Sequence, residues 1–249
     1  MLTVERVATG EAELACFALR AAEYARFYRN IPPESFCDEF DSAKCLRDGP
    51  VSQLIAVRKD DAIVGTCRLV HSCRPGSPEL RSEIAELMNL CWRDVSETVG
   101  VAAESLSVGE LGKFAVTPGE DCQQIKWLLL TEIGIVAKEA GMNVVLALMP
   151  PLVERAARQV GVTFRRLNAE GLRRDDPDRM RFLLRYHDYF LPTFRKQGID
   201  IDVDQLDAAH PTALQMLLSG AADGPALWWI SPAELAAAQF PRSLEEKLR

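Results

Sequence analysis

The sequence predicts an α/β protein, with a mixed β-sheet as the middle of three layers and helices flanking it. The chain has 249 residues, 48% of them hydrophobic, which is enough for one large core. Short apolar runs typical of strands recur from residue 52 to residue 168, and amphipathic helical patterns separate the later runs. This alternation is typical of a sheet covered by helices.

The first element that we expect is a helix over residues 9–29. Its apolar residues recur at three- and four-residue steps and form one stripe. The stripe consists of Leu14, Phe17, Ala18, Ala21, Tyr24, Ala25 and Tyr28. Pro32 and Pro33 end the helix, because proline cannot continue the helical hydrogen bonding.

A β-hairpin follows a polar loop. Residues 52–59 and 62–71 are apolar runs separated by Asp60 and Asp61, and acidic turn residues between two such runs are typical of a hairpin. Residues 82–97 carry apolar side chains at helical spacing, so we expect a helix there.

The next part of the chain alternates strands and helices. The strands are expected over residues 107–116, 143–149 and 162–168, and the helices over residues 121–140 and 152–160. Gly141 is a suitable residue to end the longer helix. The run NVVLALM is apolar throughout, as expected of a strand that is buried on both faces.

The character of the sequence changes after Asn168, where a charged linker begins. We therefore predict an α/β domain over residues 1–168 and a helical extension over residues 169–249 that packs on it. Helices are expected over residues 177–197 and 204–218, and Ser231 is placed to cap a last short helix.

Composition excludes several classes of function. The formal net charge is −7, which argues against nucleic acid as the main partner. The N-terminus lacks the features of a signal peptide, and no apolar run approaches the ~18 residues of a membrane span. The seven cysteines include no CxxC pair, so we expect reduced thiols in a cytoplasmic protein. The three histidines have no ligand spacing, and we expect no metal site.

Charged residues inside the strand SVGELGKFAV raise the main functional question. Glu110 and Lys113 interrupt an otherwise apolar run, which fits either a solvated edge strand or a reaction centre. No phosphate-binding loop, nucleophile elbow or HExxH motif is present, so many hydrolases, kinases and dehydrogenases are excluded. Other charged residues that precede this strand are Arg20, Asp38, Asp41 and Arg68. Each of them, taken singly, is equally well read as an ordinary surface or turn residue.

The order of these pieces resembles the GNAT-type acyltransferases over residues 1–168, and within them the autoinducer synthases and N-acyl amino acid synthases. Arg20 and Tyr24 stand on the first helix, and Asp38 and Asp41 have the family spacing in the following loop. The remaining matches are Gly65, Arg68 and Leu69 in the hairpin, and Glu110, Lys113 and Phe114 in the central strand. Lys113 stands where the family has arginine, Tyr24 where it has phenylalanine, and the tryptophan after the first helix is missing.

The resemblance implies an N-acyltransferase that moves an acyl group from a thioester to an amino-acid-like amine. It implies catalytic roles for Glu110, Lys113 and Arg68. It implies substrate contacts for Asp38, Asp41, Arg20, Tyr24 and Phe114, and donor contacts for Val116, Thr117 and Gly119. No tightly bound cofactor is implied, since the acyl thioester is a co-substrate.

The identity of the donor depends on the loop after the central strand. Acetyl-CoA enzymes of this type carry a basic, glycine-rich loop there, whereas this loop has one glycine followed by Glu120 and Asp121. Acidic residues repel a diphosphate, so we expect an acyl carrier protein as donor. The arginines that can meet its acidic surface are Arg165, Arg166, Arg173 and Arg174.

Two alternatives stay open at this point: an enzyme that uses acetyl-CoA or another acyl-CoA on a small metabolite, and a catalytically inactive binding module. A homodimer is also left open.

Overall fold

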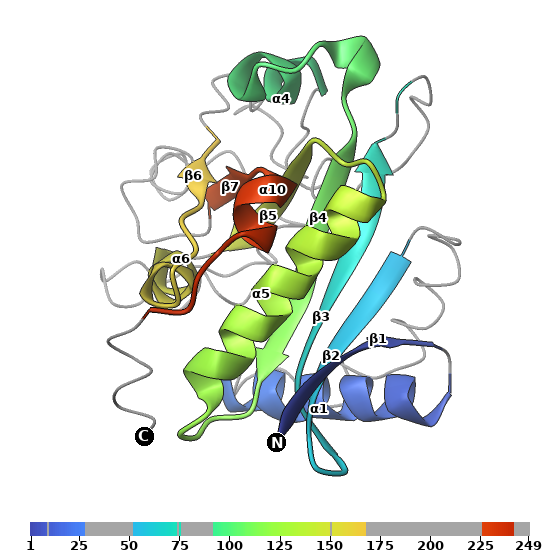
Figure 1. The fold of residues 1–249 in the computed structure, drawn as a ribbon, viewed down its shortest axis with the longest axis vertical. Helices are drawn as coiled ribbons and strands as arrows, with labels where there is room; N and C mark the ends of the chain where they lie inside the picture. Colours follow the sequence, from blue (N-terminus) through green and yellow to red (C-terminus); the bar gives the residue numbers. More distant parts are fainter. Residues whose placement is uncertain are drawn as a thin grey trace, which may run out of the picture.

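The computed structural model describes residues 1–8, 10–27, 52–73, 75, 92–149, 151–167 and 226–241. Within them, one sheet has the strand order β1-β2-β3-β4-β5-β7-β6 (Figure 1). The strands are β1 (Leu2–Val7), β2 (Ser52–Lys59), β3 (Ala62–Cys73), β4 (Val108–Val116), β5 (Val144–Met149), β6 (Arg165–Arg166) and β7 (Ala226–Ile230). β4 and β5 pair in parallel, and the other neighbours pair antiparallel. The sheet is therefore mixed, as predicted.

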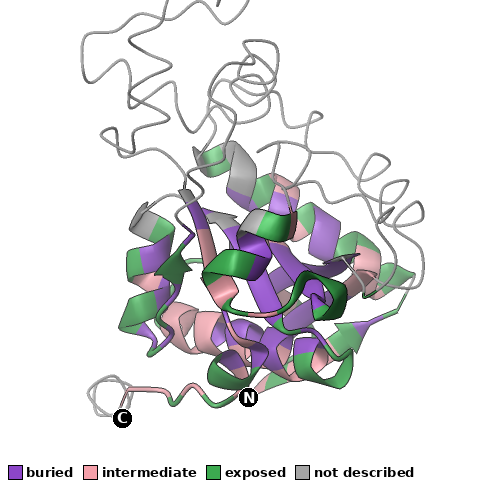
Figure 2. Cartoon of the chain, turned by 90° about the horizontal axis from the view of Figure 1, so that it is seen from above, coloured by how far each residue is buried: buried purple, intermediate pink, exposed green. Residues whose placement is uncertain are grey.

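Helices lie on both faces of the sheet (Figure 1). They are α1 (Glu11–Phe27), α4 (Trp92–Val99), α5 (Cys122–Glu139), α6 (Pro151–Gln159) and α10 (Pro232–Ala236), with a 3-10 turn, η3 (Ala103–Ser105). Figure 2 shows buried residues gathered in the interior between these layers and exposed residues around the outside. No helix among the described residues is long and apolar enough to cross a membrane.

Side chains along β2 and β3 point alternately to the two faces of the sheet. Ile55 and Leu69 pack in the main core together with residues of α5, such as Leu129. Leu54 and Ala56 instead pack with Phe17 of α1. Because successive side chains of a strand point to opposite faces, the sheet has an α5 face and an α1 face.

Most predicted elements are confirmed, including the first helix, the hairpin, the central strand and the long helix after it. The strand expected over residues 162–168 extends only over Arg165–Arg166 and lies at the edge of the sheet. The helix expected over 82–97 is described only from Trp92, and those expected over 177–197 and 204–218 lie outside the described residues.

Two strands were missed. The sequence LTVERV of β1 alternates apolar and polar residues, which is a strand signal, but it is only six residues long. The sequence ALWWI of β7 is a short apolar run before a helix, and periodicity cannot distinguish such a run from helix. As a result, the part of the extension that is described, residues 226–241, contains a strand of the sheet as well as a helix. The domain boundary at 168 stays a prediction.

The stripe predicted on the first helix was partly wrong. Leu14 and Ala18 are exposed, whereas Cys16, Phe17, Arg20 and Glu23 form the buried side of α1. These four positions have helical spacing, but two of them are charged. An apolar pattern alone could not identify this side, because burial there involves charge as well as hydrophobicity.

The C-terminal segment packs closely on α5. Ser231 caps α10 through a capping box with Glu234, as expected. The indole Nε1 of Trp127 donates a hydrogen bond of 2.9 Å to the carbonyl oxygen of Ala238. Gly134 allows this approach, because a Cβ built there would lie 2.3 Å from the backbone nitrogen of Ala236.

Gly134→Ala tests this packing. In an exposed helix, the change would stabilise the protein by about 1 kcal/mol, because alanine is the better helix former. Here the added methyl meets backbone atoms of α10, so we expect a loss of about 1–3 kcal/mol in the free energy of unfolding, measured with urea. Lys138→Ala, an exposed change on the same helix, should stay within about 0.5 kcal/mol. A stabilising Gly134→Ala would show that α10 does not lie against α5.

Candidate functional site

Charged side chains are buried on the α1 face of the sheet. Arg20, Glu23, Arg68 and Glu110 are only 2%, 8%, 3% and 5% exposed. Removing a charge from water is costly unless an opposite charge or hydrogen bonds compensate it. Two positive and two negative groups lie on this face, so the set can be neutral as a whole. We call these four residues the charge cluster.

Arg68 and Glu110 are brought together by the register of β3 and β4. Arg68 stands opposite Gly112, and Glu110 stands opposite Val70, two positions away on each strand. Residues two apart on a strand share a face, and diagonal neighbours across a pair lie about 7–8 Å apart, within reach of long side chains. Arg68 also stands opposite Leu54, which packs against α1, so both charged residues are on the α1 face.

Arg20 and Glu23 are contributed by α1, which packs against β3 and β4. The guanidinium of Arg20 lies over the ring of Phe17, 4.6 Å from its centroid, a cation–π contact. Glu23 accepts a hydrogen bond of 3.0 Å from Arg26. One turn before Arg20, Cys16 is fully buried, and burial raises the pKa of its thiol, so that it is protonated at neutral pH.

A β-bulge lies in β4 directly after this cluster. Arg68 pairs with Gly112 and Thr66 with Ala115, so Lys113 and Phe114 together stand opposite Cys67 alone. Lys113 has a φ of +55°, in the left-handed region that non-glycine residues rarely adopt. Bulges of this kind bend a strand and redirect its side chains, and they are frequent next to active sites.

β4 and β5 separate at the same level. Their parallel ladder runs from Val108 and Val144 to Leu111 and Ala147, and β5 then continues to Met149 as a partner of β7. Within the part of the chain that the structure describes, residues 112–116 of β4 have no β5 partner.

The loop between β4 and α5 leads away from this opening. Thr117 donates its backbone N–H to the carbonyl oxygen of Val64 at 2.9 Å, and Gly119 has a φ of +153°. The carboxylate of Asp121 lies 2.5 Å from the ammonium of Lys59, and this hydrogen bond raises the pKa of Lys59. The ion pair offsets part of the negative charge that the sequence suggested for this loop, while Glu120 stays exposed.

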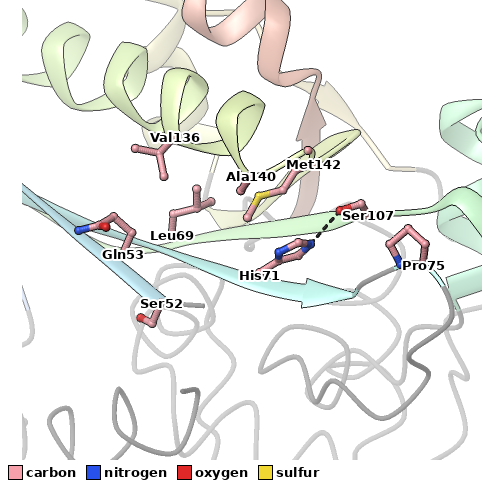
Figure 3. Close-up of a pocket in the computed structure, with 10 residues that line it drawn as sticks. Ser52, Gln53, Leu69, His71, Pro75, Ser107, Val136, Ala140 and Met142 are labelled. Atoms are coloured by element: carbon pink, nitrogen blue, oxygen red, sulfur yellow. Dashed lines mark hydrogen bonds between the residues drawn. The ribbon is translucent and has the colours of Figure 1, made fainter. Parts of the chain in front are cut away.

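A cavity of about 580 Å³ lies on the other face of the sheet, below the C-terminal end of α5 (Figure 3). It is lined by Leu69, Val136 and Met142, which belong to the α5 side of the core, and by His71 and Ser107. Because Leu69 and Glu110 point to opposite faces, the sheet separates this cavity from the charge cluster. The cluster, the bulge and the strand separation coincide, so we take them together as the candidate site.

The structure places three of the predicted residues, Arg20, Arg68 and Glu110, on the α1 face, and Lys113 and Phe114 follow in the bulge. The side chain of Phe114 packs against the core on the α5 face, away from the charge cluster. Val116 is the last residue of β4 and packs against the core on the α5 face, and Thr117 and Gly119 lie in the loop that follows. Their donor contacts stay predictions. Asp38 and Asp41 lie outside the described residues, as does the side chain of Tyr24. Their roles stay predictions.

Glu23 is the residue of the cluster that the sequence reasoning missed. It lies three positions after Arg20, on the same side of α1, and helical spacing from Arg20 was the signal that could have identified it.

Arg165, predicted to face a carrier protein, is engaged elsewhere: it forms an ion pair with Glu234, and its guanidinium lies over Trp229. This pairing lowers the pKa of Glu234 to about 2.

No protein-family model and no curated protein matches the chain. Among solved structures, FeeM, an N-acyl amino acid synthase from uncultured soil microbes, is similar with a TM-score of 0.51 and 13% identity, covering 96% of this chain and 95% of that one. The AHL synthase LasI has a TM-score of 0.47 and 11% identity, covering 97% and 96%. TofI, in a ternary complex with an inhibitor and MTA, has a TM-score of 0.43 and 20% identity, covering 68% and 82%. The likeness to FeeM confirms the predicted resemblance in fold, which was expected over residues 1–168, and the match covers 96% of the chain.

Substitutions at Lys113 test the bulge. Glycine adopts a φ of +55° without strain, whereas a β-branched valine does not. We expect Lys113→Val to unfold more easily than Lys113→Gly by about 1–2 kcal/mol, measured with urea. In a regular strand, valine would be the more stable of the two by up to about 1 kcal/mol, and that order would contradict the bulge.

Proposed function

We propose that this chain is an N-acyltransferase that moves an acyl group from a thioester to the amine of an amino-acid-like acceptor. The observation that carries the proposal is the position of Glu110. Its carboxylate is 5% exposed, lies on the same face as two buried arginines, and precedes by three residues a bulge where the central strand separates from β5. The likeness to FeeM, an N-acyl amino acid synthase, supports this assignment through the fold.

The reaction requires a neutral amine close to a polarised thioester carbonyl. In this proposal, Glu110 takes a proton from the acceptor ammonium, directly or through one water. The amine nitrogen then attacks the carbonyl carbon, the new C–N bond forms, and the C–S bond breaks. The nitrogen loses a second proton as the amide forms. This proton passes to the released thiolate, and Glu110 returns the first proton to solvent, so charge and atoms balance. A carboxylate accepts this proton only in its ionised form.

The cationic residues have a separate role in the proposal. Arg68 lies diagonally opposite Glu110, and Arg20 faces the same side of the sheet from α1. They keep the Glu110 carboxylate ionised in the free enzyme and bind the carboxylate of an amino-acid-like acceptor. Lys113, one residue past the Arg68–Gly112 pair, contributes a further positive charge. We assign the acceptor ammonium to Asp38 and Asp41, the two acids predicted in the loop after α1.

The thioester is proposed to enter between β4 and β5. Residues 112–116 lie beyond the end of the β4–β5 ladder, and a backbone N–H of this segment is proposed to donate a hydrogen bond to the carbonyl oxygen of the thioester. We favour acyl carrier protein over CoA as the carrier, because the loop before α5 has one glycine and an exposed Glu120 in place of a basic, glycine-rich turn. The Asp121–Lys59 ion pair weakens this preference, which keeps an acyl-CoA donor as the second candidate.

Glu110→Gln tests the proposed base. The amide keeps the shape of the side chain but accepts no proton, so turnover should fall by about 10²-fold or more. Turnover is measured by release of free thiol from acylated carrier protein and from acyl-CoA, with mixed amino acids as acceptors. Glu104→Gln, an exposed glutamate of η3, is the matched control and should keep full turnover. Full turnover by Glu110→Gln would remove Glu110 from the mechanism.

The same assay separates the remaining alternatives. A binding module would consume neither thioester, and a preference for acyl-CoA would assign the second donor.

Mass spectrometry of organic extracts from cells that express the protein, with Glu110→Gln cells as control, identifies the acceptor and the acyl chain. A new acylated metabolite should occur only with the unmodified chain. A cytoplasmic location and a homodimer stay predictions.

A further inference from the structure

The cavity on the α5 face is a concave site that the proposed acyl transfer does not use. It lies between the end of β3 and the C-terminal end of α5, where Figure 3 shows Leu69, Val136 and Met142 around one part of it. Its volume of about 580 Å³ falls within the range of small-molecule pockets, ≈ 300–1,000 Å³. Like most such pockets, it joins apolar walls to a few convergent polar groups.

The apolar wall is built by a close contact over Gly109. A Cβ at Gly109 would lie 2.5 Å from the sulfur of Met142 and 2.9 Å from a methyl carbon of Leu69. A side chain at this position would displace the ends of Met142 and Leu69, both of which line the cavity. Val136 of α5 and the C-cap residue Ala140 also line this side of the cavity. The resulting apolar surface suits a short hydrocarbon chain.

The polar end is a hydrogen bond between the Nε2 of His71 and the Oγ of Ser107, 2.8 Å apart. Both residues line the cavity, and they are 7% and 2% exposed. A hydroxyl has one donor and two acceptor positions, and this bond uses one of them. With the proton on Nε2, Ser107 accepts from His71 and can donate to a ligand. With the proton on Nδ1, Ser107 donates to His71 and can accept from a ligand.

A ligand group that donates and accepts equally well fits both tautomers, and an alcohol has this property. A carboxylate only accepts, and an ammonium only donates, so each fits one tautomer. Ala140 and Gly141, which directly follow the last residue of α5, also line the cavity. The negative end of the helix dipole therefore lies beside the cavity and disfavours an anion. Either ion would in addition lose its hydration on entry.

We propose that this cavity binds a small neutral amphiphile, an alcohol whose hydroxyl bonds to Ser107 and whose chain packs on Leu69, Val136 and Met142. The inference does not depend on the proposed acyl transfer, because none of these residues belongs to the charge cluster. The site belongs to the face of the sheet opposite Glu110.

The test is calorimetric titration of the full chain at pH 7 with 1-octanol, octanoate and octylammonium, which share one chain length. Octanol should bind at least about 10-fold more tightly than either ion. Ser107→Ala should weaken octanol binding about 2- to 10-fold, the usual effect of one lost hydrogen bond. Ala140→Phe, an exposed position at the rim, should abolish binding by filling the cavity.

Ala237→Phe is the matched control, because Ala237 is exposed and, like Ala140, is the C-cap residue of a helix. It should bind octanol as the unmodified chain does. Equal binding by Ala140→Phe, or no binding of octanol by the unmodified chain, would overturn the site. Tighter binding of either ion would overturn the neutral class of ligand. Unchanged octanol binding by Ser107→Ala would overturn the assigned hydroxyl contact.

Discussion

The fold has to keep Arg20, Glu23, Arg68 and Glu110 out of water while leaving none of their charges uncompensated. This constraint determines how α1 is oriented, because the helix turns Arg20 and Glu23 towards the sheet and leaves Leu14 exposed. The burial of these charges also depends on the register between β3 and β4. A shift of one residue would move Arg68 or Glu110 to the α5 face. A buried set of charges with both signs is costly as a structural device and useful as a reaction centre.

The charge cluster suits a reaction centre because of the position of Glu110 along β4. From Gly109 to Gly112 the strand pairs in regular register with β3 on one side, and as far as Leu111 it pairs with β5 on the other. The bulge at Lys113 and Phe114 and the end of the β5 ladder follow at once. A ligand that enters between the strands therefore reaches backbone groups of β4 near the buried carboxylate. The α5 face, filled by apolar side chains, supports the strand from behind.

The sequence was sufficient for those elements whose local pattern agrees with their final environment. The hairpin, the long helix α5 and the buried strand β5 follow from periodicity and turn residues. The spacing of Glu110 and Lys113 pointed to the candidate site, because charges inside an apolar strand are unusual. The strand β7 could not be predicted in the same way, since its place between β5 and β6 depends on contacts some 80 residues apart in the sequence, such as Met149 with Ala226. Glu23 was missed because a glutamate on an amphipathic helix is normally exposed.

A double-mutant cycle between Arg68 and Glu110 tests the central claim, that these two buried charges compensate each other. Arg68→Met, Glu110→Gln and the double variant are unfolded with urea at pH 7. The account predicts that each single change costs about 3–5 kcal/mol, because it leaves an uncompensated buried charge. The double change should cost at least about 1 kcal/mol less than the sum of the two. Costs that add within about 0.5 kcal/mol would contradict the claim, because independent side chains behave in that way.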